Sequence, residues 1–127
     1  MQYLFPYSEM LQKEKHQIQL HIPDLQRNDV NVVHVECERG HFQEFQMKST
    51  TFIYTIIEGT GVFFIDDQPF VAGKGDMVII PPEHKTWYAG KMNMILSSSP
   101  AYTPEDEMHI RLIEEDEMEK AWEKYLK

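Results

Sequence analysis

The sequence has a single cysteine, Cys37, among its 127 residues. One cysteine cannot close a disulfide within the chain, and cysteines cannot supply a zinc cluster. Long apolar runs are also missing, because no stretch approaches the ~20 residues that a membrane-spanning helix needs. The first residues are broken by Pro6, Glu9 and lysines, so they lack the apolar core of a secretory signal. With no other address present, we expect a cytoplasmic protein.

Basic residues are in the minority, with 12 lysines and arginines against 21 acidic residues and a net charge of −9. Nucleic acids and anionic membranes are bound through a basic footprint, so we expect neither as a partner. Glycine and proline are sparse too, at 6 and 7 residues, while 42% of the chain is hydrophobic. This balance is typical of a folded chain, and the length predicts one domain with its own core.

What the sequence does contain is a series of short strands. Val33, Val35 and Cys37 alternate with polar residues, which is the period-two pattern of a half-buried strand. Similar runs separated by turn residues follow at 42–48, 52–57, 61–65, 69–73, 77–80, 87–90, 92–99 and 109–113. A three-residue turn, 66–68, is predicted to join two of them in a hairpin. Strands of this length and spacing predict an all-β sandwich or barrel.

The two ends of the chain differ from this middle part. Residues 1–29 are mixed and are expected to form an N-terminal arm, with one short strand where Ile18, Leu20 and Ile22 alternate. Apolar residues at helical spacing near the C-terminus are Met118, Trp122, Tyr125 and Leu126. They predict a helix over 114–127 that docks on the barrel or on a partner subunit. The barrel itself is expected to span 30–113.

The stretch 75–90, GDMVIIPPEHKTWYAG, carries the spacing of a known motif. In small single-domain cupins one of two motifs reads Gly, five residues, Pro, one residue, Gly, two residues, His, three residues, Asn. Gly75 and Pro81 stand at this spacing, and the sequence resembles a cupin here. The remaining glycine, histidine and asparagine places are taken by Glu83, Thr86 and Gly90.

The other cupin motif reads Gly, five residues, His, one residue, His, three or four residues, Glu, six residues, Gly. Gly59 fits its last place, and the glutamate place then falls on Phe52. The two histidine places fall on Gln46 and Lys48 in one register, or on Phe45 and Met47 in the other. The segment 97–107 also resembles the proline-containing stretch that closes some small cupins.

The resemblance covers about residues 30–113. It implies a double-stranded β-helix, a jelly-roll-like barrel, and pairing into a homodimer. In a cupin, imidazoles and a carboxylate converge on one divalent ion. Phe52 has no lone pair to offer and the neutral hydroxyl of Thr86 is a poor ligand, so we predict no iron, manganese or zinc at the family position and no cofactor.

The same positions predict a pocket for a small organic ligand. Phe52 and Tyr54 share one face of their strand, and Thr86 and Tyr88 share a face of the strand opposite. Rings for stacking and hydroxyls for orientation suit such a ligand. The alternative is a packed core in which the rings fill the barrel.

The register of 42–48 decides the rest of the lining. Phe45 and Met47 pointing inward would make it apolar, whereas Gln46 and Lys48 would add a charge for a phosphate or carboxylate. We expect the apolar register, because burying a lone lysine is costly.

We expect the histidines and the cysteine to occupy ordinary surface or core positions. We expect His41, His84 and the pair His34–Glu36 at the surface, and see no converging partner for the other three histidines, His16, His21 and His109. Cys37, on an apolar strand face, is expected to be a small buried hydrophobe.

Three functions remain open at this point. The first is a metal-free cupin that binds a sugar or a small acid as a sensor or carrier. The second is a metal-independent isomerase, epimerase or cyclase, for which Tyr54 or Tyr88 would be the acid but no residue convincingly serves as the base. The third is a dimeric structural module with a filled barrel. A histidine or carboxylate beside those tyrosines inside a cavity would favour the enzyme.

Overall fold

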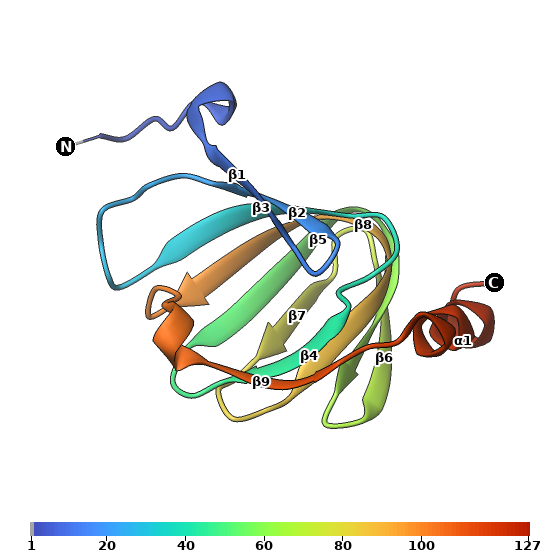
Figure 1. Ribbon diagram of the computed structural model, residues 1–127. Helices are drawn as coiled ribbons and strands as arrows, with labels where there is room; N and C mark the ends of the chain where they lie inside the picture. Colours follow the sequence, from blue (N-terminus) through green and yellow to red (C-terminus); the bar gives the residue numbers. More distant parts are fainter. Residues whose placement is uncertain (1) are drawn as a thin grey trace.

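The computed structural model describes residues 2–127, nearly all of which belong to one curled β-sheet and its connections (Figure 1). Its strands are β1 (Leu11–Lys15), β2 (Ile18–Ile22), β3 (Asn31–Cys37), β4 (Gln43–Met47), β5 (Thr51–Ile65), β6 (Gln68–Gly73), β7 (Met77–Ile80), β8 (Thr86–Ser99) and β9 (Glu107–Leu112). Two short 3₁₀ helices, Tyr7–Glu9 and Pro104–Asp106, and the α-helix α1, Glu115–Tyr125, complete the described elements. The all-β barrel with a C-terminal helix is therefore confirmed.

Strands β5 and β8 form the middle of the sheet and pair along their whole lengths, from Thr51 opposite Ser99 to Ile65 opposite Thr86. The other edge of β8 pairs with β3, which continues to β2 and β1, and near Thr86 with β4, which continues to β9. Strands β6 and β7 both pair with β5. Because the sheet curls around, β4 and β9 face β3 and β5 across the interior (Figure 1).

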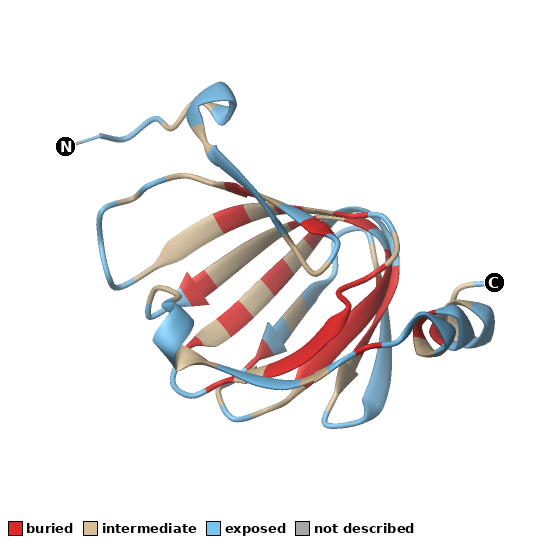
Figure 2. Cartoon of the chain, in the orientation of Figure 1, coloured by how far each residue is buried: buried red, intermediate tan, exposed pale blue. Residues whose placement is uncertain are grey.

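The alternation predicted for β3 is present. Val33, Val35 and Cys37 are buried while His34 and Glu36 are partly exposed, and the same banding runs across β5 and β8 in Figure 2. Burial raises the pKa of the Cys37 thiol to about 12, as expected for a buried hydrophobe rather than a nucleophile.

Two strands are longer than the sequence pattern predicted. The runs 52–57 and 61–65 are one strand, β5, and the runs 87–90 and 92–99 are one strand, β8. A β-bulge between Ile56 and Glu58 absorbs the break in alternation. Gly90 lies where the two strands approach closely, since a Cβ there would stand 2.5 Å from the Gly61 Cα. In the sequence these glycines looked like the ends of separate strands. In the structure they lie within β5 and β8 and allow the two backbones to come close together.

The hairpin between β5 and β6 also differs from its prediction. Its turn has two residues, Asp66 and Asp67, and Gln68 already belongs to β6. Both aspartates have positive φ angles, 50° and 70°, as the tight turn that matches strand twist requires. Aspartate tolerates this conformation better than most residues, so the pair forms the turn without glycine.

The expected N-terminal arm contributes two strands to the sheet. The hairpin β1–β2 adds to β3, with Ile18 opposite Cys37 and His21 opposite His34. Ile18 is buried in the main core. The hairpin therefore forms one wall of the barrel interior.

Helix α1 docks on the outside of the barrel. Its Met118 is fully buried and packs with Trp87 and Ala89, and Trp122 donates a hydrogen bond from Nε1 to the Arg39 carbonyl at 2.8 Å. Acidic residues fill the first turn, where they suit the helix dipole. Within residues 2–127, no helix has the length and apolar character needed to cross a membrane.

Candidate functional site

A cavity of about 160 Å³ opens into the barrel interior. A single water needs only about 10–15 Å³ by a similar measure, so this space suits a larger guest. Its apolar lining comes from Ile18, Leu20, Ile22, Val33, Phe45, Phe52 and Leu96. Its polar lining comes from Lys13, Lys15, Asn31, His41, Tyr54, Ser98, Tyr102 and Glu107. A lining that combines apolar side chains with polar groups from several strands is typical of a small-molecule site.

His41 is the main polar residue in the wall of this cavity. It lies in the connection between β3 and β4, and its backbone N–H donates to the Tyr88 carbonyl at 2.9 Å. Its ring stacks on Tyr88 at 5.5 Å between centroids and meets Phe45 edge-on at 5.2 Å. Packing on these two rings fixes the orientation of the imidazole.

The imidazole of His41 lacks partners for both of its nitrogens. The residue is 3% exposed, and neither Nδ1 nor Nε2 has a hydrogen-bond partner among residues 2–127. Burial, with the Lys15 charge adding to it, lowers the pKa of His41 to about 3. The ring is therefore neutral at physiological pH, and unpartnered buried nitrogens indicate a place for a ligand.

The expectation that His41 lies at the surface was wrong. The prediction placed it in a turn after Gly40, where side chains are usually exposed. Gly40 instead bridges to Ala89 and draws the turn against β8, which turns the next side chain inward. The sequence carries no periodic signal for this, because His41 lies outside a strand.

A charged group lies beside His41 in the lining. The Lys15 ammonium contacts the Glu107 carboxylate, and it also lies 3.4 Å from the Tyr102 hydroxyl. That hydroxyl is 3.3 Å from Glu107, so the three side chains form one hydrogen-bonded unit. Burial, followed by the Glu107 charge, raises the pKa of Tyr102 to about 12. Lys15 and Glu107 are partly buried, so their charges are less screened than at an open surface.

None of these three residues was predicted as part of the site. Tyr102 and Glu107, the latter at the start of β9, are five residues apart, but Lys15 on β1 precedes Tyr102 by 87 residues. Only the folding of the β1–β2 hairpin over the barrel brings Lys15 to Glu107.

Three of the seven residues predicted for the pocket line the cavity: Phe45, Phe52 and Tyr54. Their rings contact one another in sequence, at 5.8 Å and then 6.0 Å between centroids. Burial, with the Glu107 charge adding to it, raises the pKa of the Tyr54 phenol well above its usual value. Tyr54 is therefore a neutral hydroxyl in this wall.

The other four lie behind or away from the cavity. Tyr88 is fully buried against His41, and its hydroxyl has no partner in the described part of the chain. Met47 belongs to the core, and Thr86 is buried opposite Phe45. Gln46 is partly exposed and pairs with Met108 on β9.

The register of β4 has Phe45 and Met47 in the interior, but its opposite face is not in water. Glu44 is 1% exposed and accepts a hydrogen bond from Arg111 Nε at 2.9 Å. Arg111 also binds Glu117 of α1 through both terminal nitrogens. Helix α1 and the strand before it thus cover this face of β4 through the Arg111 contacts.

Histidines also gather on the outer face of the sheet, where we saw no partner for His21. His21 on β2 lies beside His34 and Glu36 on β3, and one ligand atom from each lies within 4.8 Å of the others. Among residues 2–127 this is the group of histidine and acidic side chains close enough to hold a metal ion. His34 and Glu36 are, as expected, outside the core.

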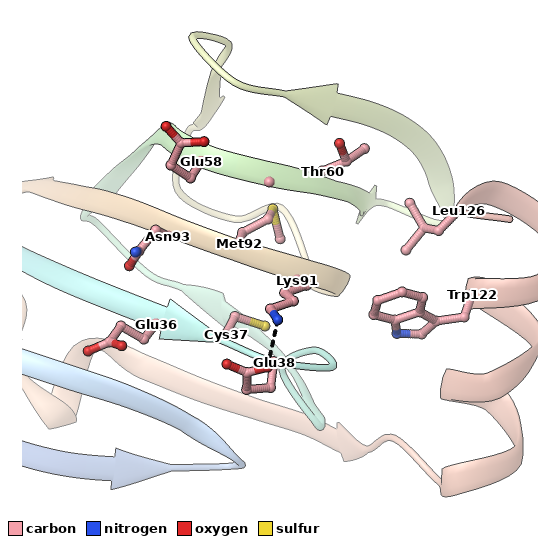
Figure 3. A pocket seen from close by; sticks show the side chains of 11 residues that line it. Glu36, Cys37, Glu38, Glu58, Thr60, Lys91, Met92, Asn93, Trp122 and Leu126 are labelled. Carbon is pink, nitrogen blue, oxygen red and sulfur yellow. Dashed lines mark ion pairs between the residues drawn. The ribbon is translucent and has the colours of Figure 1, made fainter.

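A larger hollow of about 440 Å³ lies outside the barrel, beside α1 (Figure 3). Trp122 and Leu126 border one side, and Glu58 and Asn93 lie toward the other. It is an open groove whose lining, within the described residues, holds no buried polar atom without a partner. We therefore place the chemistry in the smaller interior cavity, where His41 lies.

Comparisons with known proteins agree with a ligand-binding barrel. Residues 32–90 match the AraC-like ligand binding domain. A protein of Methanocaldococcus jannaschii, the uncharacterized protein MJ1618, is 38% identical over 58 residues, which make up 42% of this chain and 46% of that protein. The chain thus spans less than half the length of this curated relative.

The structure is also similar to that of Pac13 from Streptomyces, described as a unique nucleoside dehydratase. The TM-score is 0.90 at 35% identity, covering 92% of this chain and 98% of Pac13. Three more Pac13 structures contain uridine, each with one residue replaced: a histidine by glutamine, or one of two tyrosines by phenylalanine.

More distant structures share the fold. KdgF from Halomonas has a TM-score of 0.70 at 17% identity, covering 83% of this chain and 98% of its own. An RmlC-like cupin from Shewanella frigidimarina has a TM-score of 0.65 at 13% identity, with 80% and 93% covered. The matches together support binding of a small molecule by the barrel.

Proposed function

The chain belongs to the family of small cupins that includes Pac13, and we propose that it is a metal-independent dehydratase acting on a nucleoside or a closely related ribosyl compound. The observation that carries this proposal is the neutral imidazole of His41, buried in the cavity with both nitrogens free of protein partners. It is the base that an acid–base mechanism requires.

The replaced positions in the uridine complexes support the same residues. In the Pac13 uridine complexes the replaced histidine and the two replaced tyrosines are separated in sequence by 13 and 34 positions. His41, Tyr54 and Tyr88 have the same separations in this chain. At 35% identity over nearly all of Pac13, we align these three residues with the three replaced ones.

Loss of water from a sugar needs a base, an acid and stabilisation of the charge that develops. An imidazole can abstract a proton only from a carbon made acidic by a neighbouring carbonyl, so we infer a substrate whose ribose carries one. The C–H electron pair then forms the new double bond, and the hydroxyl on the next carbon leaves with a proton as water. The products are an unsaturated carbonyl compound and water, which balances the reaction.

His41 takes the proton in this scheme. The environment that lowers its pKa makes proton abstraction harder, but it also makes the resulting imidazolium a strong acid. The imidazolium therefore returns its proton readily to the departing hydroxyl. One residue serves as base and then as acid.

Lys15 stabilises the negative charge on the carbonyl oxygen as the carbon loses its proton. Its ammonium is held by Glu107 and Tyr102, so its position in the lining is set before the ligand enters. The hydroxyl of Tyr54 orients the sugar. The apolar part of the lining, with Asn31 and Ser98 for polar contacts, accepts the nucleobase.

The experiment is a turnover assay with protein stripped of metal by a chelator. Uridine and uridine oxidised to a ribose carbonyl compound are each incubated with wild-type protein and with His41→Gln, and products are followed by mass spectrometry. We expect loss of one water from the carbonyl compound with wild-type protein and a strongly reduced rate with the variant.

The exposed His84→Gln serves as the matched control and should retain full activity. Turnover that requires added metal, or that is equal in wild-type protein and His41→Gln, would contradict the proposal.

A further inference from the structure

We propose that the outer face of the barrel holds a second site, for one zinc ion, formed by His21, His34 and Glu36. The three residues lie on neighbouring strands, with His21 directly opposite His34 in the β2–β3 pairing. The His21 Nε2 atom is 2.6 Å from Glu36 Oε1, and the two imidazole rings are stacked at 5.3 Å. The site lies across the sheet from the cavity, since Val33 and Val35 on the same strand point inward.

The spacing of the ligand atoms suits a tetrahedral ion. Zinc binds histidine nitrogen and carboxylate oxygen at about 2.0–2.2 Å, which separates tetrahedral ligand atoms by about 3.3 Å. The atoms here lie within 4.8 Å of one another, and Glu36, at 46% side-chain exposure, has room to change rotamer. Two imidazoles and one carboxylate with an open position form a ligand set that zinc accepts.

The surroundings of His34 prepare it as a ligand. Its Nε2 lies 2.8 Å from the Asn93 side-chain oxygen, which can only accept a hydrogen bond. The proton of the neutral ring is therefore on Nε2, and the Nδ1 lone pair faces the cluster. Metal-bound histidines are commonly oriented in this way by an acceptor on the other nitrogen. Asn93 lies on β8 opposite Glu36, and both also border the groove in Figure 3.

Tyr7 covers the open side of the site. Its hydroxyl is 3.2 Å from both His34 Nδ1 and Glu36 Oε1, and its ring lies 4.7 Å from that of His21. A metal ion at the cluster would therefore meet the Tyr7 oxygen as its fourth ligand, or displace it in favour of water. Either outcome couples zinc binding to the position of the N-terminal segment.

The burial of His21 makes the cluster unfavourable for the stability of the metal-free protein. His21 is 6% exposed, and its Nδ1 has no partner among residues 2–127. A zinc ion bound to His21 Nε2 would add to the stability of the fold by linking β2 to the ligands on β3, while Nδ1 stays without a partner.

Zinc binding to chelator-stripped protein tests the proposal, with competition against a coloured chelator as the readout. Wild-type protein should bind one equivalent in the micromolar range or tighter. Glu36→Gln and His34→Gln should each weaken binding at least about 10-fold. Asn93→Leu, which removes only the outer hydrogen bond, should weaken it by about 10-fold. Because Glu36 is partly exposed, its variant is expected to fold, and circular dichroism checks this.

Two histidine variants outside the cluster serve as controls. His84→Gln and His41→Gln should both leave the zinc affinity unchanged. Absence of saturable zinc binding by wild-type protein, or unchanged affinity in folded Glu36→Gln, would overturn the proposal.

Discussion

The interior and the outer face of the barrel each gather histidine and glutamate, but they arrange these residues differently. Inside, His41 lies in the same lining as the Lys15–Glu107 pair but has no hydrogen-bond partner for either nitrogen. Outside, His21 and His34 stack together, and every ring nitrogen but one has a partner.

The difference follows from the two strand faces. No protein group bonds either nitrogen of His41, so the N–H and the lone pair of the neutral ring are both available to a guest in the cavity. The outer histidines share polar neighbours, and one nitrogen of each ring lies within 4.8 Å of a Glu36 oxygen. A lone buried imidazole suits proton transfer, and converging imidazoles suit an ion.

The largest expected effect is the loss of catalytic activity caused by a substitution inside the barrel. His41→Gln should lower kcat/KM for dehydration by about 10³-fold, since general acid–base catalysis contributes about 10²–10⁴-fold. Glu36→Gln should leave this rate within about twofold, because its side chain is on the other face of the sheet. Steady-state kinetics on both variants measures the contrast, and equal losses would erase the distinction between the two regions.

A smaller effect is expected from the charge in the cavity. Lys15→Met should lower kcat/KM by about 10²-fold, with most of the loss in kcat, because the ammonium acts on charge that develops during reaction. The exposed Lys74→Met is the matched control. A change confined to KM would instead assign Lys15 to ligand binding.

The dependence of stability on pH sharpens the account of His41. An unfolded histidine has a pKa of ~6.5, whereas the pKa of His41 in the folded protein is about 3. Between these values the unfolded chain binds a proton that the folded chain does not, so the free energy of unfolding falls as the pH is lowered from about 6.5 to 3. The slope contributed is at most about 1.4 kcal/mol per pH unit.

Urea denaturation over this pH range measures the slope, and His41→Gln should have a flatter profile. Burial also lowers the pKa of His16, so part of the slope remains in the variant. Identical profiles for the two proteins would show that His41 is not held neutral by burial.

The smallest effect is expected from the hydroxyl behind His41. Tyr88→Phe should change the free energy of unfolding by less than about 0.5 kcal/mol, because the Tyr88 Oη atom is buried without a partner in residues 2–127. Urea denaturation of the ligand-free protein measures this. A loss of more than about 1 kcal/mol would reveal a hydrogen bond that the structure lacks.

The sequence predicted the barrel and its aromatic lining because these follow from periodicity. Alternation placed Phe52 and Tyr54 on one face, and helical spacing placed Met118 and Trp122 on another. The charged residues of the site follow no periodic pattern in the sequence. His41 lies in a turn, and Lys15 meets Glu107 only because the β1–β2 hairpin closes over the interior.

The outer cluster shows the same limit. His34 and Glu36 share a strand face and could be paired from sequence, but His21 joins them through the β2–β3 register. Register across a loop of eight residues is set by which side chains the sheet buries, here Ile18 against Cys37, rather than by any local signal.

The central claim is that a guest in the barrel supplies the partners that His41 lacks. Nitrogen NMR of labelled imidazoles, recorded on metal-stripped protein with and without uridine at neutral pH, tests it most directly. The account predicts a neutral His41 ring whose nitrogen resonances shift on binding, while those of His84 stay in place. Saturating uridine that leaves the His41 resonances unmoved would contradict it.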